Sequence, residues 1–145
     1  MNAMHPDERD SVLFVCTHNS ARSQMAEGLL RDGFGDRFEV FSAGTEKTHV
    51  RPQAIAVMEE RNVDLSEYQS QTIEEVTEGR TFDYVVTVCD SAREACPYLP
   101  ARKANLHHSF EDPSSVSGSE EEKLAVFRRV RDEIDEWITH TFENR

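Results

Sequence analysis

The chain has 145 residues, of which 37% are hydrophobic, and a net charge of −12 from 28 acidic and 16 basic side chains. A chain of this length buries most of its apolar surface as one domain, without disulfides or a structural metal. The excess of negative charge argues against nucleic acid or an anionic membrane as a partner, because either would be repelled. An anionic ligand therefore needs a local site that holds it against the overall field.

The N-terminal sequence and the cysteine count indicate the compartment. The first ten residues, "MNAMHPDERD", lack the apolar core of a secretory signal, and no stretch is long enough to span a membrane. We therefore expect a cytoplasmic monomer, with a flexible N-terminus over residues 1–10 and a single catalytic domain over residues 11–145. Three cysteines are an odd number, and a cytoplasm keeps them reduced, which leaves packing, ligation or chemistry as their role.

Short runs of β-branched and aromatic residues alternate with helical patterns along the chain. We predict strands over residues 12–15, 38–44, 82–88 and 103–110. Helices are predicted from Arg22 to Gly33 or Gly35, from Pro52 to Asn62, after a capping box at Thr72, and after a second capping box at Ser119. This alternation predicts an α/β fold, a single domain with a four-stranded parallel sheet and helices on both faces. Such folds place their sites beyond the carboxyl ends of the strands.

The first predicted strand ends on Cys16, and the loop "CTHNSARS" joins it to a helix that begins near Arg22. The N–H groups of this loop and the helix N-terminus favour a bound anion, and a thiol in such surroundings ionises readily. Arg22 can hold a tetrahedral oxyanion through two parallel hydrogen bonds. Asn19 tolerates left-handed backbone, and Ser20 or Ser23 can donate to the sulfur. The alternative is that Cys16 is a small buried hydrophobic residue. The predicted oxyanion-binding residues are Thr17, His18, Asn19, Ser20, Ala21, Arg22 and Ser23.

A second thiol pair follows the third predicted strand, where Cys89 is expected on the same side of the sheet as Cys16. A capping box predicts a short helix leading from Cys89 to Cys96. Seven helical residues span about 10.5 Å, whereas a disulfide needs Cα atoms about 4.4–6.8 Å apart. Residues 90–96 would therefore have to loop out before the two cysteines could bond. The alternatives are inert packing or zinc ligation, although zinc sites favour closer cysteine pairs.

An acidic residue follows the fourth predicted strand. Pro113 biases Asp112 toward an extended conformation, and a protonated carboxyl there could give a proton to a departing oxygen. The alternative is an ordinary turn aspartate.

The segments "CTHNSARSQMAEG", "SAGT", "VVTVC", "ACPYLP" and "FEDP" together resemble the thioredoxin-coupled arsenate reductases. These enzymes have the fold of the low-molecular-weight protein tyrosine phosphatases. The likeness extends from about Ser11 to the last helix, and the three cysteines follow the family's order, with its seven-residue spacing between the last two.

This resemblance implies a relay of three cysteines that serves arsenic resistance. Cys16 would attack arsenate, whose oxygens Arg22 and the loop amides would hold, and Asp112 would protonate the leaving oxygen. Cys89 would then attack Cys16 and release arsenite, and Cys96 would carry the disulfide outward to thioredoxin, the electron donor. Phosphate or sulfate would compete with arsenate, and no tightly bound cofactor or metal is implied.

Three departures from the family pattern lie in or near the loop, and the first is His18, which stands where a glycine is common. Ala21 stands where some members have a further cysteine, which removes that thiol but not the relay. The family's potassium-binding residues map onto Asn19, Glu27 and Ser42, but the fourth position, an acid in some members, is Gln71 here. Potassium binding is therefore left as doubtful.

Two other functions compete with reduction. A low-molecular-weight protein tyrosine phosphatase would use the same thiol, arginine and acid, with water attacking the covalent intermediate. Phosphatase relatives usually have proline at the position of Gln24 and aromatic residues where Ser114 and Ser115 stand, so these residues favour the reductase. The second alternative is a non-enzymatic thiol switch that binds phosphate and changes shape on oxidation.

Overall fold

Four parallel strands form one sheet in the order β2-β1-β3-β4. The computed structural model describes residues 9–90 and 98–145. The elements are β1 (Asp10–Cys16), α1 (Arg22–Phe34), β2 (Phe38–Gly44), α2 (Pro52–Glu59), α3 (Ile73–Thr77), β3 (Tyr84–Thr87), β4 (Ala104–His107), the 3₁₀ helix η2 (Pro113–Ser115) and α4 (Glu120–Phe142). The predicted four-stranded parallel sheet is confirmed.

The strands agree with the sequence pattern in number and order, but two are shorter than predicted. β2 covers the predicted residues 38–44, and β1 begins at Asp10, the last residue of the predicted N-terminal segment. β3 and β4 have four residues each. At the start of β3, the carboxylate of Asp83 accepts the Ser11 N–H at 2.8 Å. A side chain therefore replaces a ladder bond there, and regular pairing begins only at Tyr84.

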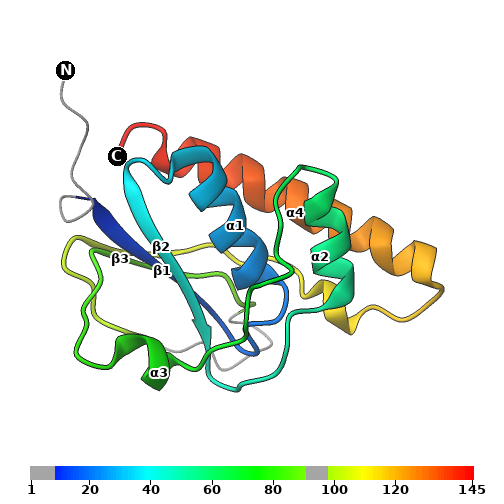
Figure 1. Ribbon diagram of the computed structural model, residues 1–145, viewed down its shortest axis with the longest axis horizontal. Coiled ribbons are helices and arrows are strands. Elements are labelled where there is room, and N and C mark those ends of the chain that lie inside the picture. The colour runs from blue at the N-terminus through cyan, green and yellow to red at the C-terminus, as the bar shows by residue number, and fades with distance from the viewer. Residues whose placement is uncertain (1–8, 91–97) are drawn as a thin grey trace.

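Alternate residues of the central strand β1 point into two separate apolar clusters. Val12, Phe14 and Cys16 pack in the larger cluster, which also holds the buried side chains of α1, α2 and α4. Leu13 and Val15 pack in a smaller cluster against α3 and residues 99–101. In Figure 1, α1, α2 and α4 lie together above the sheet and α3 lies below it. Helices on both faces, as predicted, are confirmed.

Two of the predicted helix starts are fixed by reciprocal capping bonds. Thr72 accepts from the Glu75 N–H while the Glu75 carboxylate accepts from Thr72, and Ser119 and Glu122 repeat the arrangement ahead of α4. α2 ends at Glu59, short of the predicted Asn62, whose φ of 61° places it in left-handed backbone.

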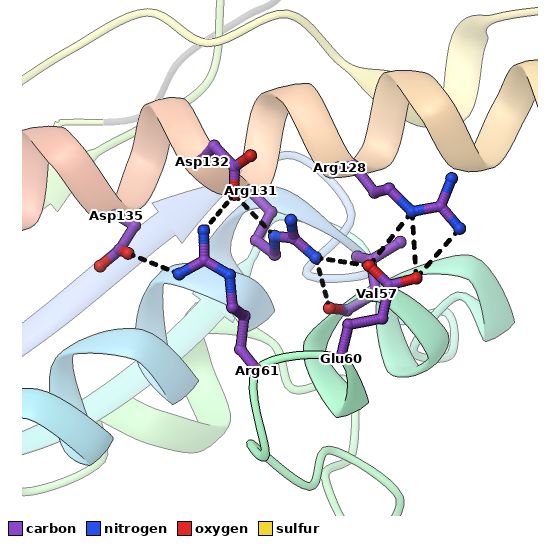
Figure 2. Close-up of polar contacts among 7 residues, drawn as sticks. All are labelled: Val57, Glu60, Arg61, Arg128, Arg131, Asp132 and Asp135. Carbon is purple, nitrogen blue, oxygen red and sulfur yellow. Dashed lines mark hydrogen bonds and ion pairs between the residues drawn. The ribbon is translucent and has the colours of Figure 1, made fainter.

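A network of arginines and carboxylates holds α2 against α4 (Figure 2). Arg131 of α4 is buried and donates to the Val57 carbonyl and the Glu60 carboxylate, both at 2.8 Å. Around it, the more exposed Arg61 pairs with acids of α4, and Arg128 pairs with Glu60. The network fixes α2, whose preceding residue contacts the loop after β1.

Candidate active site

The loop between β1 and α1 begins at Cys16 and ends at Arg22, as predicted. Cys16 is 2% exposed and is a free thiol. Its Sγ lies 2.8 Å from Ser23 Oγ and accepts the Asn19 N–H at 3.3 Å. The Asn19 N–H and the Ser23 hydroxyl are therefore both within hydrogen-bond distance of the sulfur, and each can donate to it.

The carbonyl groups of the loop point away from its hollow. Each of four consecutive carbonyls accepts a bond from a surrounding segment: Thr17 O from Glu46 N–H (3.0 Å), His18 O from Ser70 Oγ (3.1 Å), Asn19 O from Gln24 Nε2 (3.1 Å) and Ser20 O from Arg51 N–H (2.9 Å). In a planar trans peptide the N–H points opposite to the C=O. The N–H groups of residues 18–21 therefore face inward, where an anion can accept them.

Asn19 organises the loop from its centre and has a φ of 50°, in the left-handed region that the sequence led us to expect. Its Oδ1 accepts the backbone N–H of Gln71 at 2.8 Å, which fixes the orientation of the amide. Its Nδ2 therefore donates to Ser23 Oγ at 2.8 Å and to Ser42 Oγ at 2.9 Å. Ser23 accepts this bond and keeps its single hydroxyl proton, which it can donate to the Cys16 sulfur.

Arg22 and Asp112 meet beside the loop although they lie far apart in the sequence. Arg22 is 2% exposed and donates to the Phe110 carbonyl at 3.3 Å. Its Nη2 lies 3.7 Å from Asp112 Oδ2. The other Asp112 oxygen accepts the Ser114 N–H at 2.9 Å and caps η2. The acid predicted from the "DP" sequence thus lies within ion-pair distance of the predicted oxyanion-binding arginine.

Cys89 follows β3, the strand next to β1 in the sheet. It is fully buried and packs in the same apolar cluster as Cys16. The structure holds Cys89 in a disulfide bond, in contrast to the free Cys16. Cys96 and most of the predicted helix over residues 90–96 lie outside the described residues.

Within residues 9–90 and 98–145, no helix is both long and apolar enough to cross a bilayer. Over the same residues, no group of three or more His, Cys, Asp or Glu side chains is placed to hold a metal ion.

A family model named low molecular weight phosphotyrosine protein phosphatase matches residues 11–144. The chain belongs to this family. It is 46% identical over 127 residues to the arsenate reductase of Halalkalibacterium halodurans, covering 88% of this chain and 91% of that protein. A solved arsenate reductase in a phosphate-binding state superposes with a TM-score of 0.78 at 33% identity, over 93% of this chain and 98% of that chain. The thioredoxin-dependent arsenate reductase of Corynebacterium glutamicum gives a TM-score of 0.71 at 26% identity, over 97% of this chain and 63% of that one.

Two residues that shape the loop, Gly44 and Ser70, were not predicted from the sequence. Gly44 ends β2, and a Cβ on it would lie 2.7 Å from Thr17 O and 2.8 Å from Asn19 N. Ser70 donates to the His18 carbonyl and accepts the Thr48 N–H at 3.0 Å. The glycine of "SAGT", at the last position of the predicted strand, was the available signal for Gly44, because glycine in a strand often marks a close approach of another backbone. Nothing local to Ser70 indicates its role.

Proposed function

We propose that the chain reduces arsenate to arsenite by a relay through Cys16, Cys89 and Cys96. The observation that carries the proposal is the position of Cys89, buried in the same cluster as the anchored Cys16 and following the adjacent strand. A hydrolase needs the loop, the arginine and the acid, but it has no need of a second cysteine there. The similarity to arsenate reductases of known name supports the same choice.

In the first step Cys16 attacks the arsenic atom of a bound arsenate. The inward N–H groups of the loop and the Arg22 guanidinium bind the equatorial oxygens. Protonated Asp112 gives its proton to the departing oxygen, which leaves as water once it has a second proton. The product is a sulfur–arsenic(V) bond at Cys16, and no electrons have yet been transferred.

In the second step the Cys89 sulfur attacks Cys16 Sγ. A sulfur–sulfur bond forms and the sulfur–arsenic bond breaks, and its electron pair remains on arsenic, which leaves as arsenite. Cys96 then attacks Cys89, restoring the Cys16 thiolate and leaving a Cys89–Cys96 disulfide. The dithiol of thioredoxin reduces this disulfide and closes the cycle.

The competing hydrolysis would need water to attack the Cys16 intermediate. A positioned intramolecular group acts at an effective concentration that can reach about 10⁵ M or more. Cys89 therefore outcompetes water wherever it reaches Cys16. Phosphate and sulfate, which share the tetrahedral shape of arsenate but cannot be reduced by this relay, would act as competing anions.

The test combines two assays on the full-length chain. Arsenate-dependent NADPH oxidation is followed with thioredoxin and thioredoxin reductase, and hydrolysis of p-nitrophenyl phosphate is followed separately. Cys16→Ser is expected to abolish both activities. Cys89→Ser is expected to abolish arsenite release and to leave phosphate-ester hydrolysis within about twofold, because water needs only the loop, Arg22 and Asp112.

Cys96→Ser separates the last step from the first two. We expect one equivalent of arsenite per chain and a Cys16–Cys89 disulfide, identified by mass spectrometry, with no further turnover. Asp112→Asn is the matched control, since it should slow arsenate reduction and ester hydrolysis together. Multiple turnovers by Cys96→Ser with thioredoxin as the sole reductant would falsify the relay as written.

A further inference from the structure

A continuous chain of hydrogen bonds joins the Cys16 thiol to a carboxylate on α1. It runs from Cys16 through Ser23 to Asn19, and from Asn19 to Ser42 at 2.9 Å. Ser42 Oγ donates to Glu27 Oε1. Both hydroxyls accept from Asn19, Ser42 donates its own proton to Glu27, and Ser23 can donate its proton to the sulfur. The carboxylate therefore helps to orient the hydroxyl beside the sulfur.

A carboxylate at this position acts on the thiol in two opposing ways. Glu27 orients Ser42, but its negative charge disfavours a second negative charge on Cys16 unless a cation offsets it. The Glu27 side chain is only 14% exposed, so water screens its charge incompletely. The arrangement therefore requires a positive charge at Glu27.

Arg31, one helical turn after Glu27, provides that charge. Its Nη2 donates to Glu27 Oε2 at 2.6 Å, and the guanidinium also donates to the Tyr68 hydroxyl and the Val40 carbonyl. Burial opposes the charged form of Arg31, but the Glu27 carboxylate outweighs burial and raises the pKa of Arg31 above its ordinary value. Acceptors from three segments thus hold the guanidinium beside the Glu27 carboxylate. An ordinary pair of exposed residues one helical turn apart has only one such contact and is held less firmly.

The same residues do not fit a potassium ion. Asn19 Oδ1 already accepts bonds from Gln71 N–H and from a neighbouring glutamine side chain. The two oxygens of Glu27 accept from Ser42 and Arg31, and Gln71 contributes no negative charge. A monovalent cation would also be repelled by the guanidinium at hydrogen-bonding distance from the carboxylate.

We propose that Arg31 is a positioning residue that supplies, from within the chain, the positive charge at Glu27, and that Cys16 reactivity is therefore independent of monovalent cations. Arg31 touches neither substrate nor sulfur and acts through Glu27, Ser42 and Asn19. The inference rests on Cys16 as the reactive thiol but not on arsenate as the substrate, so the two proposals can fail separately.

The test measures alkylation of Cys16 by iodoacetamide against pH, in a Cys89→Ser/Cys96→Ser background where Cys16 is the sole thiol. Arg31→Met is expected to slow alkylation at pH 6.5 by about threefold to tenfold and to move the pH profile to higher pH, because one carboxylate loses its counter-charge. Arg31→Lys should restore most of the rate. Arg128→Met, which removes an equally charged group from the Glu60 pair on the far helix, should leave it unchanged.

Cation dependence and a double variant give two further readouts. The parent protein should react equally fast in potassium chloride and choline chloride, whereas Arg31→Met should be faster in potassium chloride, since Glu27 lines a cavity of about 300 Å³ that opens to solvent. Adding Glu27→Gln to Arg31→Met should return the rate to within about twofold of the parent, because the unpaired charge is gone. A double variant as slow as Arg31→Met, or a parent protein that responds to potassium, would overturn the proposal.

Discussion

Replacing Gly44 by alanine tests whether the close packing of β2 against the loop governs the reaction. The new Cβ would lie 2.7 Å from Thr17 O, 2.8 Å from Asn19 N and 2.9 Å from His18 C, and all three are backbone atoms. To reach an ordinary contact of 3.4 Å, the Thr17 carbonyl would have to retreat by about 0.7 Å. Catalytic groups tolerate displacements of about 0.5 Å, and a 1 Å error can cost about 100-fold in rate. We therefore expect a 10- to 100-fold loss of arsenate reduction, with about 1–3 kcal/mol lost from the free energy of unfolding.

Gly33→Ala is the matched control, because a Cβ at this position in α1 meets nothing within 4 Å. It should stabilise the protein by about 0.5–1 kcal/mol, as alanine is the better helix former, and leave activity unchanged. Urea unfolding and arsenate-dependent NADPH oxidation measure the two effects. Full activity in Gly44→Ala, with the stability of the parent, would refute the reasoning that the loop has no room to move.

Two further predictions concern stability. Arg131→Met is expected to lower the free energy of unfolding by about 1–3 kcal/mol, because a buried carbonyl loses its donor. Arg128→Met removes an exposed ion pair with Glu60, and water can take the place of the lost contacts. This variant should therefore lower the urea midpoint far less than Arg131→Met, and equal decreases in the two variants would contradict this account. Burial raises the pKa of Asp83, but the Ser11 N–H and the Arg102 guanidinium outweigh it and leave that pKa below its usual value. A lowered folded-state pKa gives stability that is complete above the unfolded value of about 3.9 and is lost as the pH falls through the folded one. Asp83→Asn should therefore be less stable than the parent at pH 7. It should also lose less stability than the parent when the pH falls below 5. Urea midpoints that decrease in parallel for the two proteins over that range would count against this prediction.

The parts of the fold that could be predicted from the sequence depend on local patterns. The run over residues 38–44 begins with Phe38, Val40 and Phe41, and the structure gives the same limits for β2. Thr72 and Ser119 each have a glutamate three residues later, and both capping boxes form. Cys16 stands at the end of an apolar run and is followed by small polar residues and Arg22. This pattern was sufficient to place the loop at the carboxyl end of the first strand. These features need only the period of a strand or the first turn of a helix.

The parts that could not be predicted depend on contacts between distant segments. Whether Gly44 or Ser70 touches the loop is decided by sheet register and by the path of a connecting segment, which local sequence does not encode. The start of β3 was predicted too early because the Asp83 carboxylate accepts a backbone N–H of the neighbouring strand. Arg31 looks like an ordinary partner for a glutamate one turn earlier, and only the positions of Ser42 and its neighbours relate it to the thiol.

The outward direction of the loop carbonyls would let a chain with a net charge of −12 hold the oxyanion that we propose as its ligand. Long-range repulsion is screened beyond about 8–10 Å at physiological salt, but contacts inside a buried site are not. A single inward carbonyl would place a negative dipole against the ligand and remove one N–H from it. The bonds that Glu46, Ser70 and Arg51 make from outside the loop would therefore be part of the proposed oxyanion site, because they hold the carbonyls away from its hollow. Since Gly44 packs directly beneath the same peptides, a methyl group there would disturb the local field as well as the shape of the loop.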